Sequence, residues 1–114
     1  MKICMIGTGY VGLVTGACFA EMGHHVSCVD ENQEKINTLR SGILPIYEPG
    51  LEYIVQKNSK EGRISFTTDS KIGLEQALFC FIAVGTPQCG DGSADLYYIF
   101  TVAREIGRCM NGYL

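Results

Sequence analysis

A pattern of three glycines close to the amino terminus, Gly7-x-Gly9-x-x-Gly12, limits the fold of this chain more than any other feature. A short apolar run at residues 2–6 leads directly into the pattern and predicts a buried strand. Residues 10–22 follow, with apolar side chains at helical spacing. A glycine turn between a strand and a helix allows these two elements to pack closely, as they do in a dinucleotide-binding βαβ unit.

An acidic residue stands at the end of the next predicted strand. Residues 25–29 form a second apolar run, and Asp30 follows it directly. Counted from Gly12, Asp30 lies close to the interval of about 20 residues that is expected between the glycines and the acidic residue of such units. A carboxylate there can accept hydrogen bonds from an adenosine ribose, and its charge would repel a 2′-phosphate. The sequence therefore favours NAD over NADP. Lys35, one helical turn further on, could reach the same ribose or phosphate; a solvated surface lysine is the alternative.

The three glycines have different expected roles in this turn. Gly7 permits the tight turn, Gly9 lets the backbone approach a pyrophosphate, and Gly12 lets the helix pack closely on the strand. Free N–H groups in the first turn of the helix, together with the helix dipole, would then hold the diphosphate. The alternative is that the glycines only make a turn.

Strands and helices alternate along the rest of the chain. Further strands are predicted at residues 64–67 and 78–84, and further helices at 32–40, 49–61, 69–77 and from 95 onward. This alternation predicts an α/β fold with a Rossmann-type doubly wound parallel sheet, incomplete at about four strands, in the order 3-2-1-4 and flanked by helices. The apolar run at residues 78–84 is typical of a parallel strand that is buried on both faces.

A threonine follows the last predicted strand. In a sheet of this order, a ligand binds beyond the carboxyl ends of strands one and four. Thr86 lies at the second of these ends and is placed to offer a hydroxyl or backbone group to the nicotinamide half of the cofactor. The alternative is that Thr86 and Pro87 simply end the strand.

Charge and hydropathy exclude several classes of protein. The formal net charge is −3, and the lysines and arginines are scattered, so no basic face for a nucleic acid is expected. The apolar run at 78–84 is far shorter than the roughly 18 residues of a membrane span. No long apolar region of a signal peptide precedes the glycines. We expect a cytoplasmic protein without a membrane partner.

The six cysteines form no metal-binding or disulfide pattern. No Cys-x-x-Cys pair and no Cys/His ligand spacing occurs. Cys89, in a glycine-rich segment, is the one thiol expected to be exposed. The other five lie in apolar patterns and are expected to pack as small apolar side chains: Cys4, Cys18, Cys28, Cys80 and Cys109.

Several segments carry a resemblance to a known family. The residues concerned are 2–16, 44–51, 81–87 and 91–96, in family order and across nearly the whole chain. Their Tyr-Glu-Pro-Gly-Leu and Val-Gly-Thr-Pro motifs are much more specific than the glycine turn. On these motifs the chain resembles the amino-terminal, NAD-binding part of the nucleotide-sugar 6-dehydrogenase family.

The resemblance implies particular contacts with NAD. They fall on Tyr10 and Val11 in the turn, on Asp30 and Lys35, and on Thr86. It also implies that the whole protein oxidises the C6 alcohol of a nucleotide sugar to a carboxylate, with two NAD molecules. UDP-glucose is the leading substrate, and GDP-mannose or a UDP-N-acetylhexosamine is the alternative.

The resemblance assigns no catalytic residue to this chain. In the family, the cysteine nucleophile, its lysine partner and the UDP-sugar site come from regions that would follow residue 114. We therefore expect residues 1–114 to be an NAD-binding domain truncated at its carboxyl-terminal end and inactive by itself. The whole protein is expected to form a homo-oligomer. An alternative from a different functional class is an NAD-binding module without catalytic activity.

The same expectation of truncation bears on solubility. The strand at residues 78–84 would lack its usual neighbour, and an apolar edge strand invites pairing with another chain. We therefore expect self-association or low solubility.

Overall fold

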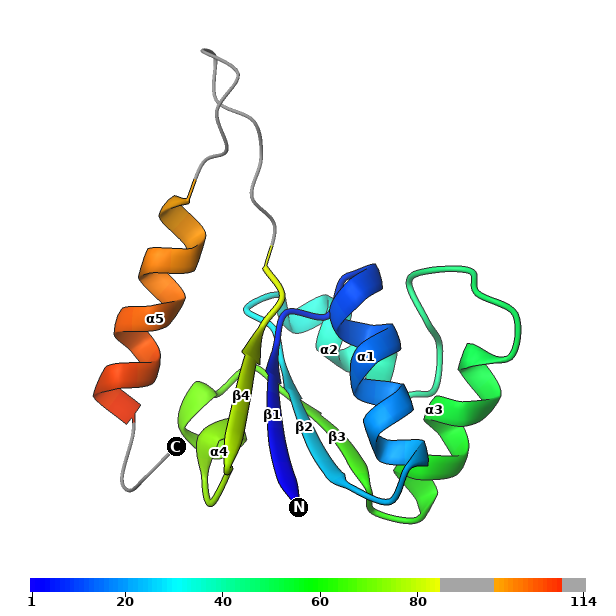
Figure 1. The fold of residues 1–114 in the computed structure, drawn as a ribbon. Coiled ribbons are helices and arrows are strands. Elements are labelled where there is room, and N and C mark those ends of the chain that lie inside the picture. The colour runs from blue at the N-terminus through cyan, green and yellow to red at the C-terminus, as the bar shows by residue number, and fades with distance from the viewer. Residues whose placement is uncertain (85–95, 110–114) are drawn as a thin grey trace.

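The computed structural model describes residues 1–84 and 96–109, and all statements on structure refer to these two ranges (Figure 1). Strands and helices alternate in the predicted order. The strands are β1 (Lys2–Ile6), β2 (His25–Val29), β3 (Ile64–Thr67) and β4 (Phe79–Ile82). The helices are α1 (Tyr10–Glu21), α2 (Gln33–Arg40), α3 (Leu51–Lys60), α4 (Ser70–Leu74) and α5 (Tyr97–Cys109).

The four strands form one parallel sheet in the order β3-β2-β1-β4, which confirms the predicted order. Helices cover both faces, with α1, α2 and α3 on one side and α4 and α5 on the other (Figure 1). β1 is central and buried on both faces. Met5 packs in the first helical layer, whereas Cys4 and Ile6 pack in the second.

The helix boundaries follow from local capping chemistry. Asn32 precedes α2, and its side-chain oxygen accepts a hydrogen bond from the Lys35 backbone N–H at 3.1 Å. Asp69 does the same for α4 through the N–H of Lys71, at 2.9 Å. Helix α4 is shorter than the predicted 69–77, because Gln76 turns into the left-handed region at φ 61°.

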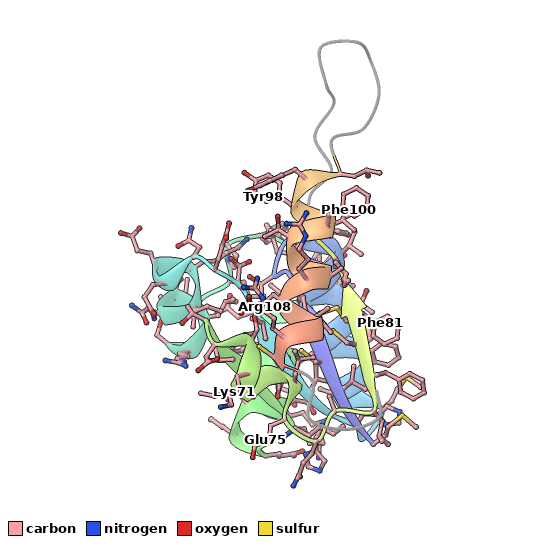
Figure 2. The ribbon with its side chains drawn as sticks, turned by 90° about the vertical axis from the view of Figure 1, so that its left-hand side faces the viewer. Lys71, Glu75, Phe81, Tyr98, Phe100 and Arg108 are labelled. Carbon is pink, nitrogen blue, oxygen red and sulfur yellow. The ribbon has the colours of Figure 1, made fainter. Side chains whose placement is uncertain are left out.

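The expectation that the last strand is buried on both faces is wrong. β4 pairs with β1 on one side, and no other described strand lies along its second edge. Phe79 and Phe81, which point to the same face of the sheet, are 51% and 41% exposed, and Ile82 is exposed as well. Figure 2 shows Phe81 at the margin of the molecule, beside β4. The apolar run predicts the strand, but two-sided burial would need helices over both faces, and the face that carries Phe79 and Phe81 is left partly open.

The cysteine expectations are confirmed in part. Cys4 and Cys28 are buried, and Cys80 and Cys109 are partly buried. Cys18 is exposed on α1, so the expectation for this residue is wrong. Its position fits the apolar spacing of the helix, but α1 turns its small residues Gly16, Ala17 and Ala20 to the sheet. Cys89 lies outside the described residues.

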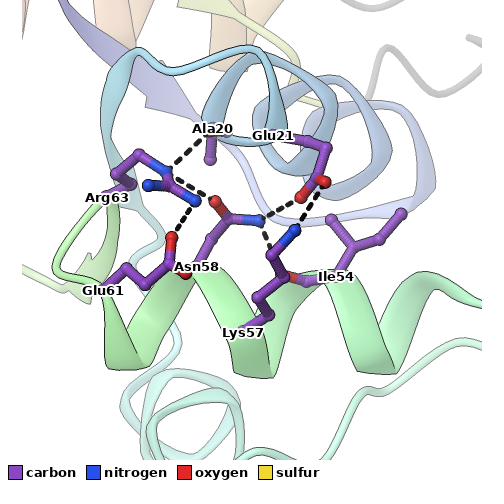
Figure 3. Close-up of polar contacts among 7 residues, drawn as sticks. All are labelled: Ala20, Glu21, Ile54, Lys57, Asn58, Glu61 and Arg63. Carbon is purple, nitrogen blue, oxygen red and sulfur yellow. Dashed lines mark hydrogen bonds and ion pairs between the residues drawn. The ribbon is translucent and has the colours of Figure 1, made fainter.

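A buried asparagine ties the end of α1 to α3 and to Arg63, the residue before β3 (Figure 3). The Asn58 side chain is fully buried, and its Nδ2 donates to Glu21 Oε2 and to the Ile54 carbonyl, both at 2.8 Å. Its Oδ1 accepts from Arg63 Nε at 2.8 Å, and the same Nε donates to the Ala20 carbonyl at 3.1 Å. Because all of these partners belong to the chain itself, the network is structural.

Replacement of Asn58 by leucine is expected to destabilise the fold. The Nε of the partly buried Arg63 loses one acceptor and Glu21 loses one donor, which we expect to lower the free energy of unfolding by about 1–3 kcal/mol. Urea denaturation measures the change. Lys57→Met is the control, since it removes only the exposed ion pair with Glu21 and should change stability much less. Equal effects of the two substitutions would contradict a central role for Asn58.

The exposed edge of β4 predicts self-association. Light scattering of the 114-residue chain should give a mean mass that rises with concentration, because an apolar, unpaired edge recruits a second copy. Phe79→Lys should reduce this rise, since it puts a charge beside that edge. Tyr47→Lys is the matched control, because Tyr47 is 90% exposed but lies on the connector before α3. A constant monomer mass for the unaltered chain would refute the prediction.

Candidate NAD-binding site

A cavity of about 540 Å³ lies at the carboxyl ends of the strands. The loops after all four strands contribute to it, and α5 forms a further wall. This is the position at which doubly wound sheets bind their ligands. The lining residues are Ile6, Gly7, Thr8, Gly9, Val29, Asp30, Glu31, Lys35, Thr68, Ser70, Ala83, Val84, Tyr98, Thr101, Val102 and Glu105.

Two glycines of the turn are required by the fold itself. Gly7 has φ +106°, and a Cβ atom there would lie 2.4 Å from the Ala83 carbonyl oxygen. A Cβ atom on Gly12 would lie 2.0 Å from the Gly7 carbonyl oxygen. These distances are far inside van der Waals contact, so any side chain would push β1, α1 and the end of β4 apart. The roles predicted for Gly7 and Gly12 agree with this geometry.

Gly9 is different, because nothing in the fold excludes a side chain there. Its φ is −75°, and a Cβ atom would meet no heavy atom within 4 Å. Gly9 also lines the cavity. The open space over its backbone is therefore available for the close approach of a ligand, which is the role predicted for this glycine.

The first turn of α1 offers backbone donors at the same place. Gly9 is the N-cap residue of this 12-residue helix, no side chain caps it, and the first turn carries no acidic residue. The backbone N–H groups at the start of a helix need acceptors, and the helix dipole favours an anion there. A diphosphate over Gly9 would satisfy both requirements.

Asp30 is held in place by the protein. Its Oδ2 accepts hydrogen bonds from Thr8 Oγ1 at 2.7 Å and from the Thr8 backbone N–H at 3.1 Å. Its Oδ1 accepts from the Asn32 backbone N–H at 3.0 Å. Lys35 Nζ lies 3.6 Å from Oδ2, and the Asp30 side chain is 14% exposed. The structure thus brings Asp30 and Lys35 together at the cavity wall, as the sequence predicts.

Opposing effects act on the pKa of Asp30. Burial raises it, but the hydrogen bonds from Asn32 and Thr8, together with the positive charge of Lys35, lower it by more. The net pKa lies below the usual range of an aspartate, so the carboxylate is ionised at neutral pH. An ionised carboxylate accepts hydrogen bonds from ribose hydroxyls and repels a phosphate.

Tyr10 and Val11 face away from the interior, with their side chains exposed. The Tyr10 hydroxyl donates to Glu48 Oε2 at 2.8 Å, and this carboxylate raises the pKa of the phenol. Neither side chain lines the cavity, so contacts from these two residues would come from their backbone at the start of α1. Thr86, which was predicted to contact the nicotinamide half, lies outside the described residues.

Sequence reasoning missed several residues of the cavity. Thr8 is fully buried and joins the glycine turn to Asp30, but it occupies a variable position of the glycine pattern. Thr68 and Ser70 come from the loop after β3. Helix α5 contributes Tyr98, which Figure 2 shows near its start, and Glu105. The sequence predicts a helix from residue 95 onward, but it does not predict a part for this helix in the cavity.

Comparison with known proteins identifies the family. The model of the NAD binding domain of the UDP-glucose/GDP-mannose dehydrogenase family matches residues 1–113. The chain belongs to this family. The predicted fold class, the resemblance and the NAD cofactor are thereby confirmed. The individual contact residues stay predictions.

Curated relatives match nearly the whole of this chain. A UDP-glucose 6-dehydrogenase of Rhizobium meliloti is 52% identical over 114 residues, which are 99% of this chain and 26% of that protein. A GDP-mannose 6-dehydrogenase of Pseudomonas aeruginosa is 46% identical over 107 residues, or 94% of this chain and 24% of that protein. The chain therefore spans about a quarter of the length of these relatives.

Solved structures agree with the sequence matches. The ternary complex of GDP-mannose dehydrogenase from Pseudomonas aeruginosa matches with a TM-score of 0.92 and 45% identity, over 96% of this chain and 25% of that one. A UDP-glucose dehydrogenase from Pyrobaculum islandicum gives a TM-score of 0.90 and 42% identity, over 95% and 25%. Among the described residues of our chain, no helix is long and apolar enough to cross a membrane.

The lowered pKa of Asp30 predicts how stability depends on pH. Stability contributed by the ionised carboxylate is present above the pKa of an unfolded aspartate, about 3.9, and is lost as the pH falls through the lower folded pKa. The unaltered protein should therefore lose stability relative to Asp30→Asn below about pH 4. Urea denaturation from pH 7 to pH 3 measures the difference.

Glu31→Gln is the control for this experiment, because it removes the neighbouring, exposed carboxylate. We expect its stability to stay nearer to that of the unaltered protein across the range. A difference between the unaltered protein and Asp30→Asn that is independent of pH down to pH 3 would contradict the lowered pKa.

Proposed function

We propose that this chain is the NAD-binding part of a UDP-glucose 6-dehydrogenase, an enzyme that oxidises UDP-glucose to UDP-glucuronate with two NAD molecules. The UDP-glucose relative is the more similar of the two curated relatives described above, at 52% against 46% identity. Residues 1–114 bind and orient the cofactor, and the remaining three quarters of such an enzyme bind the sugar nucleotide. We place the whole enzyme in the cytoplasm, as a homo-oligomer.

The observation that carries the proposal is the open space over Gly9. The fold does not require a glycine there, yet the position lies on the cavity, beside the uncapped start of α1. A ligand that places an anion close to the backbone would explain why this position is a glycine. Gly9 and Asp30 line the same cavity, and NAD carries a ribose next to its pyrophosphate.

Each predicted residue has a defined part in holding the cofactor. Backbone N–H groups of Tyr10 and Val11 bind the pyrophosphate, Asp30 and Lys35 bind the adenosine ribose, and Thr86 contacts the nicotinamide half. Bound NAD supplies the acceptor for the hydride that leaves C6 of the sugar. Gly7 and Gly12 act indirectly, because they hold the turn in the shape that exposes those N–H groups.

A relative that acts on GDP-mannose is the second candidate. The GDP-mannose dehydrogenase structure matches this chain with a TM-score of 0.92, so the NAD-binding fold is shared between enzymes for different sugars. Turnover assays with UDP-glucose, GDP-mannose and a UDP-N-acetylhexosamine, on the protein that carries this sequence, distinguish the candidates. NAD binding without turnover of any sugar would instead indicate a non-catalytic module.

Replacement of Gly9 by alanine is expected to weaken NAD binding while the fold is retained. The added methyl group meets no protein atom but occupies the space of the pyrophosphate, so NAD affinity should fall by about tenfold or more. Calorimetric titration measures the affinity, and thermal unfolding measures stability.

Gly107→Ala is the matched control for this substitution. A Cβ atom there also meets nothing within 4 Å, but Gly107 lies on α5 and does not line the cavity. This variant should bind NAD like the unaltered protein. Unchanged NAD affinity in Gly9→Ala would overturn the assignment of the pyrophosphate site.

A further inference from the structure

Thr8 is a buried polar residue whose hydrogen bonds lead to the ribose side of the cavity. Its exposed fraction is 0%, and it lies between Gly7 and Gly9 in the turn. Both its backbone N–H and its hydroxyl donate to the same oxygen, Asp30 Oδ2, at 3.1 and 2.7 Å. The shorter distance is typical of a hydroxyl bound to an ionised carboxylate.

The two oxygens of Asp30 are consequently not equivalent. Oδ2 accepts both hydrogen bonds from Thr8 and has Lys35 Nζ at 3.6 Å. Oδ1 accepts one hydrogen bond from the described residues, that of the Asn32 backbone N–H at 3.0 Å. A carboxylate oxygen has two lone pairs, so Oδ1 retains one for a ligand.

We infer that Thr8 is a positioning residue for cofactor selection: its hydroxyl fixes the Asp30 carboxylate so that Oδ1 receives the 2′-hydroxyl of the adenosine ribose and a 2′-phosphate is repelled. The inference rests on the proposed NAD site and adds to it the residue that orients the ribose acceptor. Thr8 itself touches neither the ribose nor the reacting atoms in this scheme.

The physical reason is rotation of the Asp30 side chain. The carboxylate has two rotatable bonds, and two donors on a rigid turn restrict both of them. Without the hydroxyl, Oδ2 keeps a single donor from the turn, and the carboxylate can rotate toward the Lys35 ammonium. Rotation weakens the hydrogen bond to the 2′-hydroxyl and also moves the negative charge away from a 2′-phosphate. Both changes reduce discrimination between NAD and NADP.

The test compares three ligands on three forms of the protein. The ligands are NAD, NADP and an NAD analogue that lacks the 2′-hydroxyl of the adenosine ribose. Thr8→Val keeps the buried volume and removes the hydroxyl, whereas Thr8→Ser keeps the hydroxyl and serves as the control. Calorimetric titration gives the three dissociation constants for each form.

In the unaltered protein and in Thr8→Ser, NAD should bind more tightly than the deoxy analogue and NADP. In Thr8→Val both preferences should shrink by about tenfold, the loss expected for one charge-assisted hydrogen bond. A purely structural role for Thr8 would weaken all three ligands equally and leave the two ratios unchanged, which would overturn the inference. If Thr8→Val does not fold, as judged by circular dichroism, Thr8→Ala provides the same comparison.

The experiment separates failure of the inference from failure of the proposed function. If the unaltered protein binds none of the three ligands, the NAD site itself is wrong. If it prefers NAD and Thr8→Val retains the same ratios, the site stands and Thr8 has no positioning role.

Discussion

The close contact of backbone with backbone at the glycine turn is the constraint on which the site depends. A Cβ atom on Gly7 would overlap the backbone of Ala83, and a Cβ atom on Gly12 would overlap the backbone of Gly7. The end of β1, the start of α1 and the end of β4 therefore meet at one point. The Gly7 N–H donates to the Val29 carbonyl at 2.7 Å, which brings the end of β2 to the same point. This packing creates the cavity and places Thr8 against Asp30.

Local chemistry and chain topology account for what the sequence predicted correctly. The strand order follows from alternating strands and helices, because right-handed crossovers leave few arrangements. The start of α2 at Asn32 follows from the ability of its side chain to accept a backbone hydrogen bond. The position of Asp30 at the cavity follows from its place at the carboxyl end of β2, and that of Lys35 from its place in the first turn of α2. Each of these inferences uses information contained within a short segment.

Properties that depend on distant neighbours were not predictable in the same way. The run containing Phe79 and Phe81 has the composition of a central strand, but burial depends on whether another element lies beside it. The pairing of Thr8 with Asp30 joins residues 22 positions apart, and no periodic pattern marks it. The contribution of Glu105 to the cavity likewise depends on where α5 docks. In each case the decisive contact is absent from the local sequence.

Two polar networks show how structure and ligand binding differ in this chain. No buried side-chain nitrogen or oxygen of the described residues lacks a hydrogen-bond partner, so both networks are satisfied. Around Asn58 the partners of both polar atoms belong to the protein, and the side chain is fully buried, so it is not open to a ligand. Around Asp30 the protein saturates Oδ2 but leaves a lone pair on Oδ1, at the wall of the cavity. An acceptor that is fixed by the protein, ionised and only half-used, on a residue that lines the cavity, is preorganised for a donor from outside the chain, and a ribose hydroxyl is such a donor.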